Sequence, residues 1–176
     1  KPISRTELIL AKFFAAMAYV IVLLAWMALF ALGLSIILFG TGDVVVAKSF
    51  ELHQVEKADV LWRYFSAFGF AALALVLVAA LSLLLSVLSD NSIGPIVATV
   101  CIIIVCTLIS EMQIPLYDKY FKPYLFTTYM LGWKGFFYIG VDADGQTIRG
   151  SLQNFPAILK SIGVLVTYII VFVTAS

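Results

Sequence analysis

Four long stretches of this chain carry no charged residue, and this pattern constrains its fold more than any other feature. The stretches cover residues 13–42, 64–89, 91–110 and 161–176. A transmembrane α-helix needs about 20 consecutive apolar residues, which the first three stretches supply. The fourth is shorter and continues to the last residue. The pattern predicts an all-α membrane protein whose four transmembrane helices cover residues 9–39, 60–88, 92–111 and 156–176.

The composition excludes several classes of protein. Of the 176 residues, 63% are hydrophobic and 12% are charged, whereas soluble domains average about 45–50% and about 25%. The formal net charge of +1 lacks the basic excess that nucleic-acid binding requires. We therefore expect membrane lipid rather than nucleic acid as a partner, and a single transmembrane domain over residues 1–176.

Two longer connections, residues 40–59 and 112–155, separate the predicted helices. The first is expected to be a polar loop, with Asp59 capping the helix that follows it. The second is aromatic-rich, and its short apolar part, residues 125–138, is interrupted by Lys134. Such aromatic crowding is typical of a membrane interface, so we expect a re-entrant or interfacial helical segment rather than a fifth crossing. Its candidate interfacial residues are Tyr117, Tyr124, Tyr129 and Trp133.

Residues that could carry chemistry are few. His53 lies near Glu51 and Glu56, but zinc sites need three or four close ligands, and a solvated loop histidine is expected. No serine, cysteine or aspartate has a recognisable base beside it. We therefore expect no catalytic residue, metal site or bound cofactor in this chain.

Small residues recur at helical spacing along the first two predicted helices and indicate close helix packing. The first stripe contains Ala11, Ala15, Ala18 and Ala25, and the second runs from Ala67, Ala71 and Ala74 to Ser82, Ser86 and Ser89. Ser82 and Ser86 are alternatively candidates for lining a substrate pathway. Glu111 closes the third predicted helix, where it has either a structural role or a pathway role.

The start of the chain carries a helix signal. Ser4 and Glu7 form a capping box, in which each satisfies a backbone donor at a helix start. A helix from Ser4 to Phe39 would be about 50 Å long, well beyond a hydrocarbon core of about 30 Å. Its first turns are expected to protrude from the membrane.

Two segments resemble type-2 ABC transporter permeases. The first is Lys1-Pro2-Ile3-Ser4-Arg5, followed by Glu7, Leu8 and Ala11-Lys12, which resembles the segment leaving the cytoplasmic coupling helix of that family. The second covers residues 81–92, Leu-Ser-Leu-Leu-Leu-Ser-Val-Leu-Ser-Asp-Asn-Ser. It resembles the family's serine-bearing helix, tight inner turn and following helix.

The resemblance implies a membrane-spanning subunit of an ABC exporter in the bacterial plasma (inner) membrane. The chain would then be a piece holding the last four of six transmembrane helices, with external re-entrant helices in the aromatic connection. ATP and Mg²⁺ would bind a partner ABC ATPase, and a second permease subunit, identical or not, would complete the complex. Pro2, Ser4, Arg5 and Glu7 would couple the helix to the ATPase. The alternative is a non-transporting membrane scaffold or assembly subunit.

Four crossings predict that residues 43–58 and 112–155 share one side of the membrane, opposite Lys1 and Asp90, and the resemblance makes that side external. Single cysteines at Ser49, Asp90 and Gln146, in a chain without Cys101 and Cys106, test this with an impermeant thiol reagent in intact cells. We expect labelling at positions 49 and 146 only. Labelling at position 90 alone would overturn the orientation.

Overall fold

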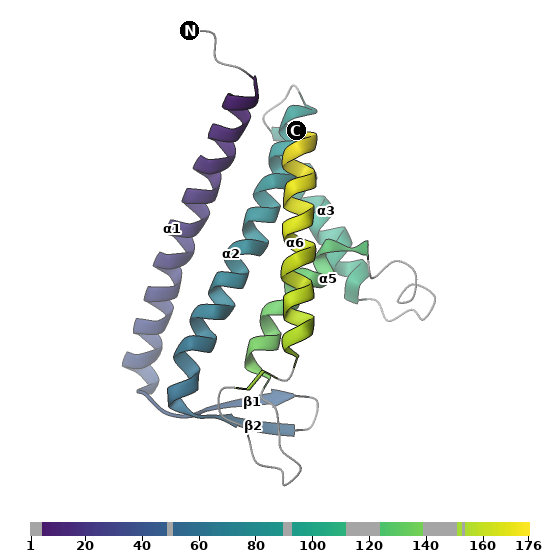
Figure 1. The fold of residues 1–176 in the computed structure, drawn as a ribbon. Coiled ribbons are helices and arrows are strands. Elements are labelled where there is room, and N and C mark those ends of the chain that lie inside the picture. Colours follow the sequence, from purple (N-terminus) through teal and green to yellow (C-terminus); the bar gives the residue numbers. More distant parts are fainter. Residues whose placement is uncertain (1–4, 49–50, 90–92, 112–123, 139–150, 153) are drawn as a thin grey trace.

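Four long helices dominate the computed structural model, which describes residues 5–48, 51–89, 93–111, 124–138, 151–152 and 154–176 (Figure 1). They are α1 (Arg5–Phe39), α2 (Lys57–Val87), α3 (Ile93–Glu111) and α6 (Phe155–Ala175). Each is long and apolar enough to cross a membrane. Each helix covers most of one charge-free stretch, which is consistent with the predicted all-α membrane protein.

The first helix is unbroken over 35 residues, which corresponds to about 52 Å. It begins at Arg5, carries Glu7 in its first turn and ends at Phe39. Gly40 ends it with a positive φ of 73°, a backbone conformation that glycine adopts without strain. The Gly40 N–H still donates to the Ile36 carbonyl at 2.9 Å. The helix is therefore about 20 Å longer than a hydrocarbon core.

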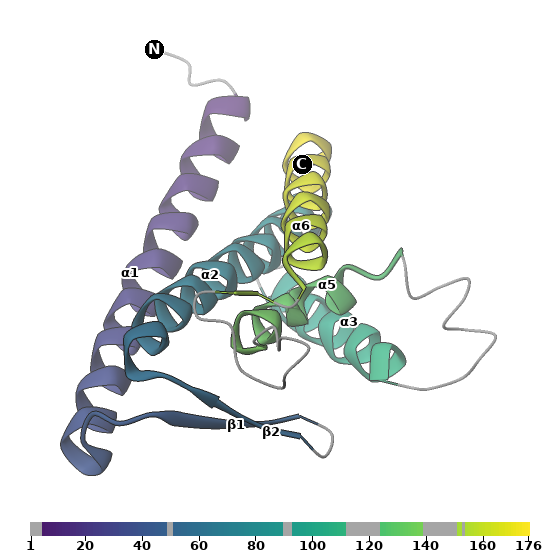
Figure 2. The same cartoon turned by 60° about the horizontal axis from the view of Figure 1, so that its bottom comes forward.

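Residues 40–59 contain a β-hairpin where a loop was expected. Strands β1 (Val44–Lys48) and β2 (Glu51–Val55) pair antiparallel, with Val44 opposite Val55. The β-branched run Val44–Val45–Val46 favours an extended strand and was the available sequence signal. The hairpin extends sideways from the adjoining ends of α1 and α2, at the end of the molecule where α6 begins (Figures 1 and 2).

The predicted cap at Asp59 is wrong, because α2 begins two residues earlier. The backbone N–H of Lys57 donates to Asp43 Oδ1 at 3.0 Å, and Lys57 Nζ donates to Thr41 Oγ1 at 2.8 Å. The carboxylate that caps α2 therefore comes from the other side of the hairpin. Asp59 instead accepts a hydrogen bond from Trp62 Nε1 at 3.3 Å.

Helix α2 lies at the centre of the packing. One cluster joins it to α5 and α6, and a second joins it to α1 through Phe13, Val76 and Ala80. The Tyr64 hydroxyl also donates to the Ala28 carbonyl of α1 at 2.8 Å. The first cluster consists of Phe70, Leu77, Leu81, Phe126, Ile158 and Leu165.

The two stripes of small residues differ in how far they are buried. On α2, Ala67 and Ala74 are buried as expected. On α1, the predicted alanine stripe is exposed, and Phe13, Leu24 and Ala28 are the buried residues instead. Helix α1 therefore packs on α2 through a face of mixed large and small side chains, which the alanine spacing alone did not indicate.

Two short helices lie within the aromatic connection. They are α5 (Phe126–Met130) and the 3₁₀ helix η2 (Leu131–Phe137), of 5 and 7 residues. Together they are shorter than the length a crossing needs. Phe126 packs against Tyr168 and Phe172 of α6, and Phe136 packs edge-on against Phe70 of α2. These two helices, which we call the aromatic segment, are therefore held between α2 and α6.

Gly132 permits this close approach. A Cβ there would lie 2.7 Å from Phe70 Cζ and 3.1 Å from Ser161 Cβ. We expect Gly132→Ala to lower the free energy of unfolding by about 1–3 kcal/mol, because the overpacked methyl group separates η2 from both helices. Chemical denaturation in detergent micelles measures this change.

Gly69 provides the matched control, because a Cβ at this exposed position of α2 meets nothing within 4 Å. Gly69→Ala should be neutral or stabilising by up to about 1 kcal/mol, as expected inside a helix. Equal stability of the two variants would contradict the tight contact at Gly132.

Candidate functional site

Arg63 of α2 joins the aromatic segment to the rest of the protein. Its Nη1 donates to the Phe136 carbonyl and its Nη2 to the Ser151 carbonyl, both at 2.7 Å. Arg63 is 0% exposed, and its Nη2 lies 3.6 Å from Asp59 Oδ2. One side chain thus ties α2 to the end of η2 and to the residues just before α6. We call this arrangement the Arg63 clamp.

The acceptors of the Arg63 clamp explain how a buried guanidinium is tolerated. The Phe136 carbonyl lies at the C-terminal end of η2, where carbonyls lack partners within the helix and the helix dipole is negative. Asp59 supplies a nearby negative charge, and the guanidinium lies 4.8 Å from the centre of the Trp62 ring. Within the described residues, Nε alone of its nitrogens has no hydrogen-bond partner.

Two neighbouring hollows follow one face of α2 beside the aromatic segment. The first, of ≈ 290 Å³, lies among Tyr64, Ala67, Phe68, Ala71, Trp133 and Phe137. The second, of ≈ 280 Å³, extends from Ala71 and Trp133 to α3 and α5. The two share Ala71 and Trp133, so they adjoin each other along α2, and we call this pair of hollows the α2 groove. Its further lining includes Ala74, Leu75, Ile103, Thr107, Thr127 and Met130.

Hydroxyl groups fasten α5 to α3 at the far end of the α2 groove. Ser110 Oγ lies 3.2 Å from Thr127 Oγ1 and 2.8 Å from Thr128 Oγ1. Thr127 Oγ1 also donates to the Cys106 carbonyl at 3.2 Å. Such hydrogen bonds join helices effectively where water is scarce. The Thr127 hydroxyl is thus engaged within the protein.

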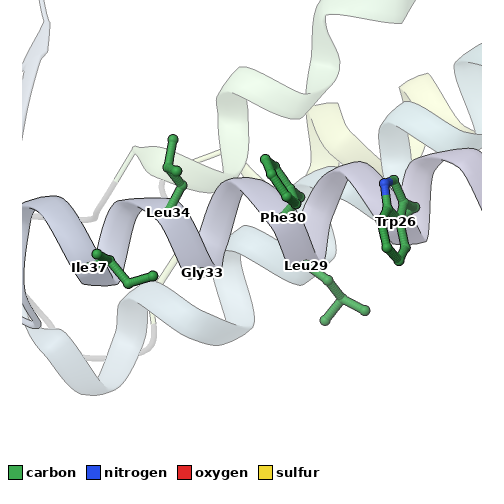
Figure 3. A pocket seen from close by; sticks show the side chains of 6 residues that line it. All are labelled: Trp26, Leu29, Phe30, Gly33, Leu34 and Ile37. Atoms are coloured by element: carbon green, nitrogen blue, oxygen red, sulfur yellow. The ribbon is translucent and has the colours of Figure 1, made fainter.

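A separate hollow of ≈ 410 Å³ lies on the exposed surface of α1, centred on Gly33. Phe30 and Leu34 border it on one side and Leu29 and Ile37 on the other (Figure 3). Trp26 stacks on Phe30, with ring centroids 6.5 Å apart. These side chains are 51–81% exposed, so the hollow is an apolar surface that no described element of the chain covers.

Of the predicted coupling residues, Arg5 and Glu7 belong to the first turn of α1. Pro2 and Ser4 fall outside the described residues, as does the side chain of Arg5. Glu7 is exposed in the first turn of the helix. The capping box and the coupling role therefore stay predictions.

The predicted pathway residues are not brought together. Ser82 is half-buried and Ser86 exposed in the last turns of α2, next to the link with α3. Glu111 is the final residue of α3, about 27 Å along that helix from its start, and its side chain lies outside the described set. The serines thus lie near the link that leads into α3, whereas Glu111 is at the opposite end of α3.

The predicted interfacial aromatics occupy different environments. Tyr124 is exposed, and its carbonyl accepts a hydrogen bond from the Tyr168 hydroxyl at 2.6 Å. Tyr129 packs against the hydrophobic cluster that joins α2 to α5 and α6, and Trp133 lines both hollows of the α2 groove. Tyr117 lies outside the described residues. His53 belongs to β2, and its side chain is likewise not described.

Sequence reasoning missed Arg63. Its signal was an isolated arginine directly before a long charge-free stretch, since a charge at that position must be paired or reach water. The carbonyls that it binds are 73 and 88 residues away in the chain. Local sequence gave no indication of these acceptors.

Comparison with known protein families, curated proteins and solved structures gave no match. Inferences about function therefore depend on the residues and their geometry.

Loss of the Arg63 clamp should destabilise the protein. Arg63→Met leaves two carbonyls without their donors, and we expect the free energy of unfolding to fall by about 3 kcal/mol. The free energy of unfolding of Arg63→Lys should lie between those of Arg63→Met and the native protein. A single ammonium group lacks the forked geometry with which a guanidinium reaches two acceptors. Denaturant titration in micelles measures both.

Lys160→Met is the matched control, since Lys160 is exposed on α6 and such changes are usually within about 0.5 kcal/mol. If Arg63→Met were as stable as this control, the clamp would not hold the segment.

Proposed function

We propose that this protein is a membrane-spanning permease subunit of an ATP-binding-cassette exporter. It would convert ATP hydrolysis by a partner ATPase into movement of its helices and of a substrate across the membrane. ATP and Mg²⁺ would bind that partner, and this chain would contribute neither a catalytic residue nor a cofactor site. In this proposal the chain supplies the last four of six transmembrane helices.

The start of α1 carries the proposal. Residues 1–12 resemble the segment that leaves the coupling helix in type-2 ABC permeases. Helix α1 begins at Arg5 and continues unbroken to Phe39, so a rigid rod of about 52 Å joins that segment to the hairpin end of the molecule. A stiff helix transmits a displacement at one end to the other, which a coupling element requires.

The aromatic segment gives further support. In the family, re-entrant external helices lie between the last two transmembrane helices, and α5 and η2 occupy that place between α3 and α6. The Arg63 clamp holds η2 against α2 at the hairpin end of the bundle. We propose that α5 and η2 dip into the outer leaflet and close the external end of the pathway.

The surface of α1 is compatible with further helices in the complex. Trp26, Phe30 and Ile37 are 64–81% exposed, and the described part of the chain leaves this side uncovered. A second permease subunit, identical or not, and the remaining helices of the same subunit are the partners that the proposal requires. The bacterial inner membrane is the location that it implies.

A non-transporting membrane scaffold or assembly subunit is the alternative. It would use the same packed helices and exposed apolar surface without energy coupling. A purified complex with substrate-stimulated ATP hydrolysis favours the exporter, whereas co-purification without an ATPase favours the scaffold.

The coupling role is tested in the complex with its ATPase. We expect Arg5→Glu to abolish transport and its stimulation of ATP hydrolysis while the complex remains assembled in the membrane. The pair Ser4→Ala and Glu7→Ala should weaken the helix start by about 1 kcal/mol, the usual scale for a lost cap, and should reduce coupling. Transport and ATPase assays of purified complexes measure both.

Lys12→Glu separates coupling from membrane anchoring, because it reverses an exposed charge about 10 Å further along the same helix. If Arg5 only anchors the helix to the membrane, Arg5→Glu and Lys12→Glu should reduce transport and ATPase activity equally. If Arg5 couples the helix to the ATPase, only Arg5→Glu should reduce them. Normal activity of both Arg5→Glu and the double alanine variant would refute the coupling role.

A further inference from the structure

The α2 groove has the length of one membrane leaflet. From Tyr64 to Leu75, the residues of α2 that line it, the helix axis rises about 16 Å. Half of a typical hydrocarbon core is about 15 Å. A groove of this length accommodates one acyl chain lying parallel to α2.

The position of the groove along α2 matches the leaflet at the hairpin end of the molecule. The charge-free stretch of α2 starts at Tyr64, directly after Arg63. Tyr64 lines the first hollow, and tyrosine side chains prefer the boundary between headgroups and hydrocarbon. The groove therefore begins at the polar boundary and reaches toward the bilayer centre.

The lining of the groove suits a hydrocarbon chain. Alanines at positions 67, 71 and 74 leave space along α2, and aromatic side chains of η2 form the opposite wall. Thr127, at the deep end, is already hydrogen-bonded to the Cys106 carbonyl and close to Ser110. Because the Thr127 hydroxyl already has hydrogen-bond partners in the protein, a ligand at that depth can be entirely apolar.

A basic residue stands beside the shallow end. Lys134 is exposed on η2 and follows Trp133. Residues three apart in a 3₁₀ helix are eclipsed, so Lys134 shares an edge of η2 with Phe137, which lines the first hollow. By contrast, the hollow at Gly33 of α1 is lined by apolar residues and glycine only. The α2 groove thus combines an apolar trough with an adjacent cation.

We propose that the α2 groove binds one acyl chain of an anionic phospholipid from the hairpin-side leaflet, with the lipid phosphate paired to Lys134. The lipid would fill the space between α2 and η2 and brace the aromatic segment from its exposed side. This site is independent of the transport role, because an exporter subunit and a scaffold would both present it.

Quenching of Trp133 fluorescence tests the proposal, because this side chain lines both hollows. The protein carries Trp26→Phe and Trp62→Phe so that Trp133 is its remaining tryptophan, and it is reconstituted with phosphatidylglycerol or phosphatidylcholine brominated on one acyl chain. We expect quenching by both lipids, with an apparent affinity about fivefold higher for phosphatidylglycerol, the effect of about one cation near a membrane surface.

Two pairs of variants separate the site from general lipid contact. Lys134→Gln should remove the preference for phosphatidylglycerol, whereas Lys160→Gln, at an exposed lysine of α6, should keep it. Ala71→Phe fills the point where the hollows meet and should also remove the preference. Ala31→Phe makes the same change at an exposed position of α1 that lines none of the hollows described above, and should leave the preference intact.

Three results would overturn the proposal. Absence of quenching would mean that protein, not lipid, covers Trp133. Equal affinities for the two lipids in the native background would exclude anion recognition. If the preference for phosphatidylglycerol fell equally in the Lys134 and Lys160 variants, or equally in the Ala71 and Ala31 variants, the preference would come from the protein surface in general and not from the α2 groove. Should Ala71→Phe not fold, the lysine pair decides the question at exposed positions.

Discussion

Backbone carbonyls without a hydrogen-bond partner are costly away from water. Three carbonyls of the aromatic connection, residues 112–155, accept hydrogen bonds from side chains of the long helices. Arg63 of α2 donates to the carbonyls of Phe136 and Ser151, and Tyr168 of α6 donates to the carbonyl of Tyr124. The described part of the aromatic connection is thus held in part by donors that reach across from neighbouring helices.

This dependence makes α2 the organising element. The same helix packs on α1 through Val76 and Ala80, on η2 through Phe70 and on α6 through Leu77. Its small residues do two things, since Ala67 and Ala74 are buried and also leave the trough of the α2 groove. Packing and a candidate lipid site therefore arise from one stripe of alanines.

The exposed surfaces of the molecule are unevenly distributed. Helix α1 contributes Trp26, Phe30 and Ile37 to a broad apolar face, while the aromatic segment presents Lys134 beside a groove. An apolar face of this kind suits lipid tails or further helices, whereas a cation beside a groove distinguishes one lipid from another. The two surfaces thus have different recognition chemistry.

The sequence by itself determined the four long helices, because the absence of charge over about 20 residues leaves the backbone no other way to satisfy its hydrogen bonds in lipid. It also predicted the end of the first helix at Phe39. Tertiary structure alone decided the cap of α2 by Asp43, the face of α1 that packs on α2 and the acceptors of Arg63. Each of these joins residues that are far apart in the chain, and local periodicity carries no information about which distant groups will meet.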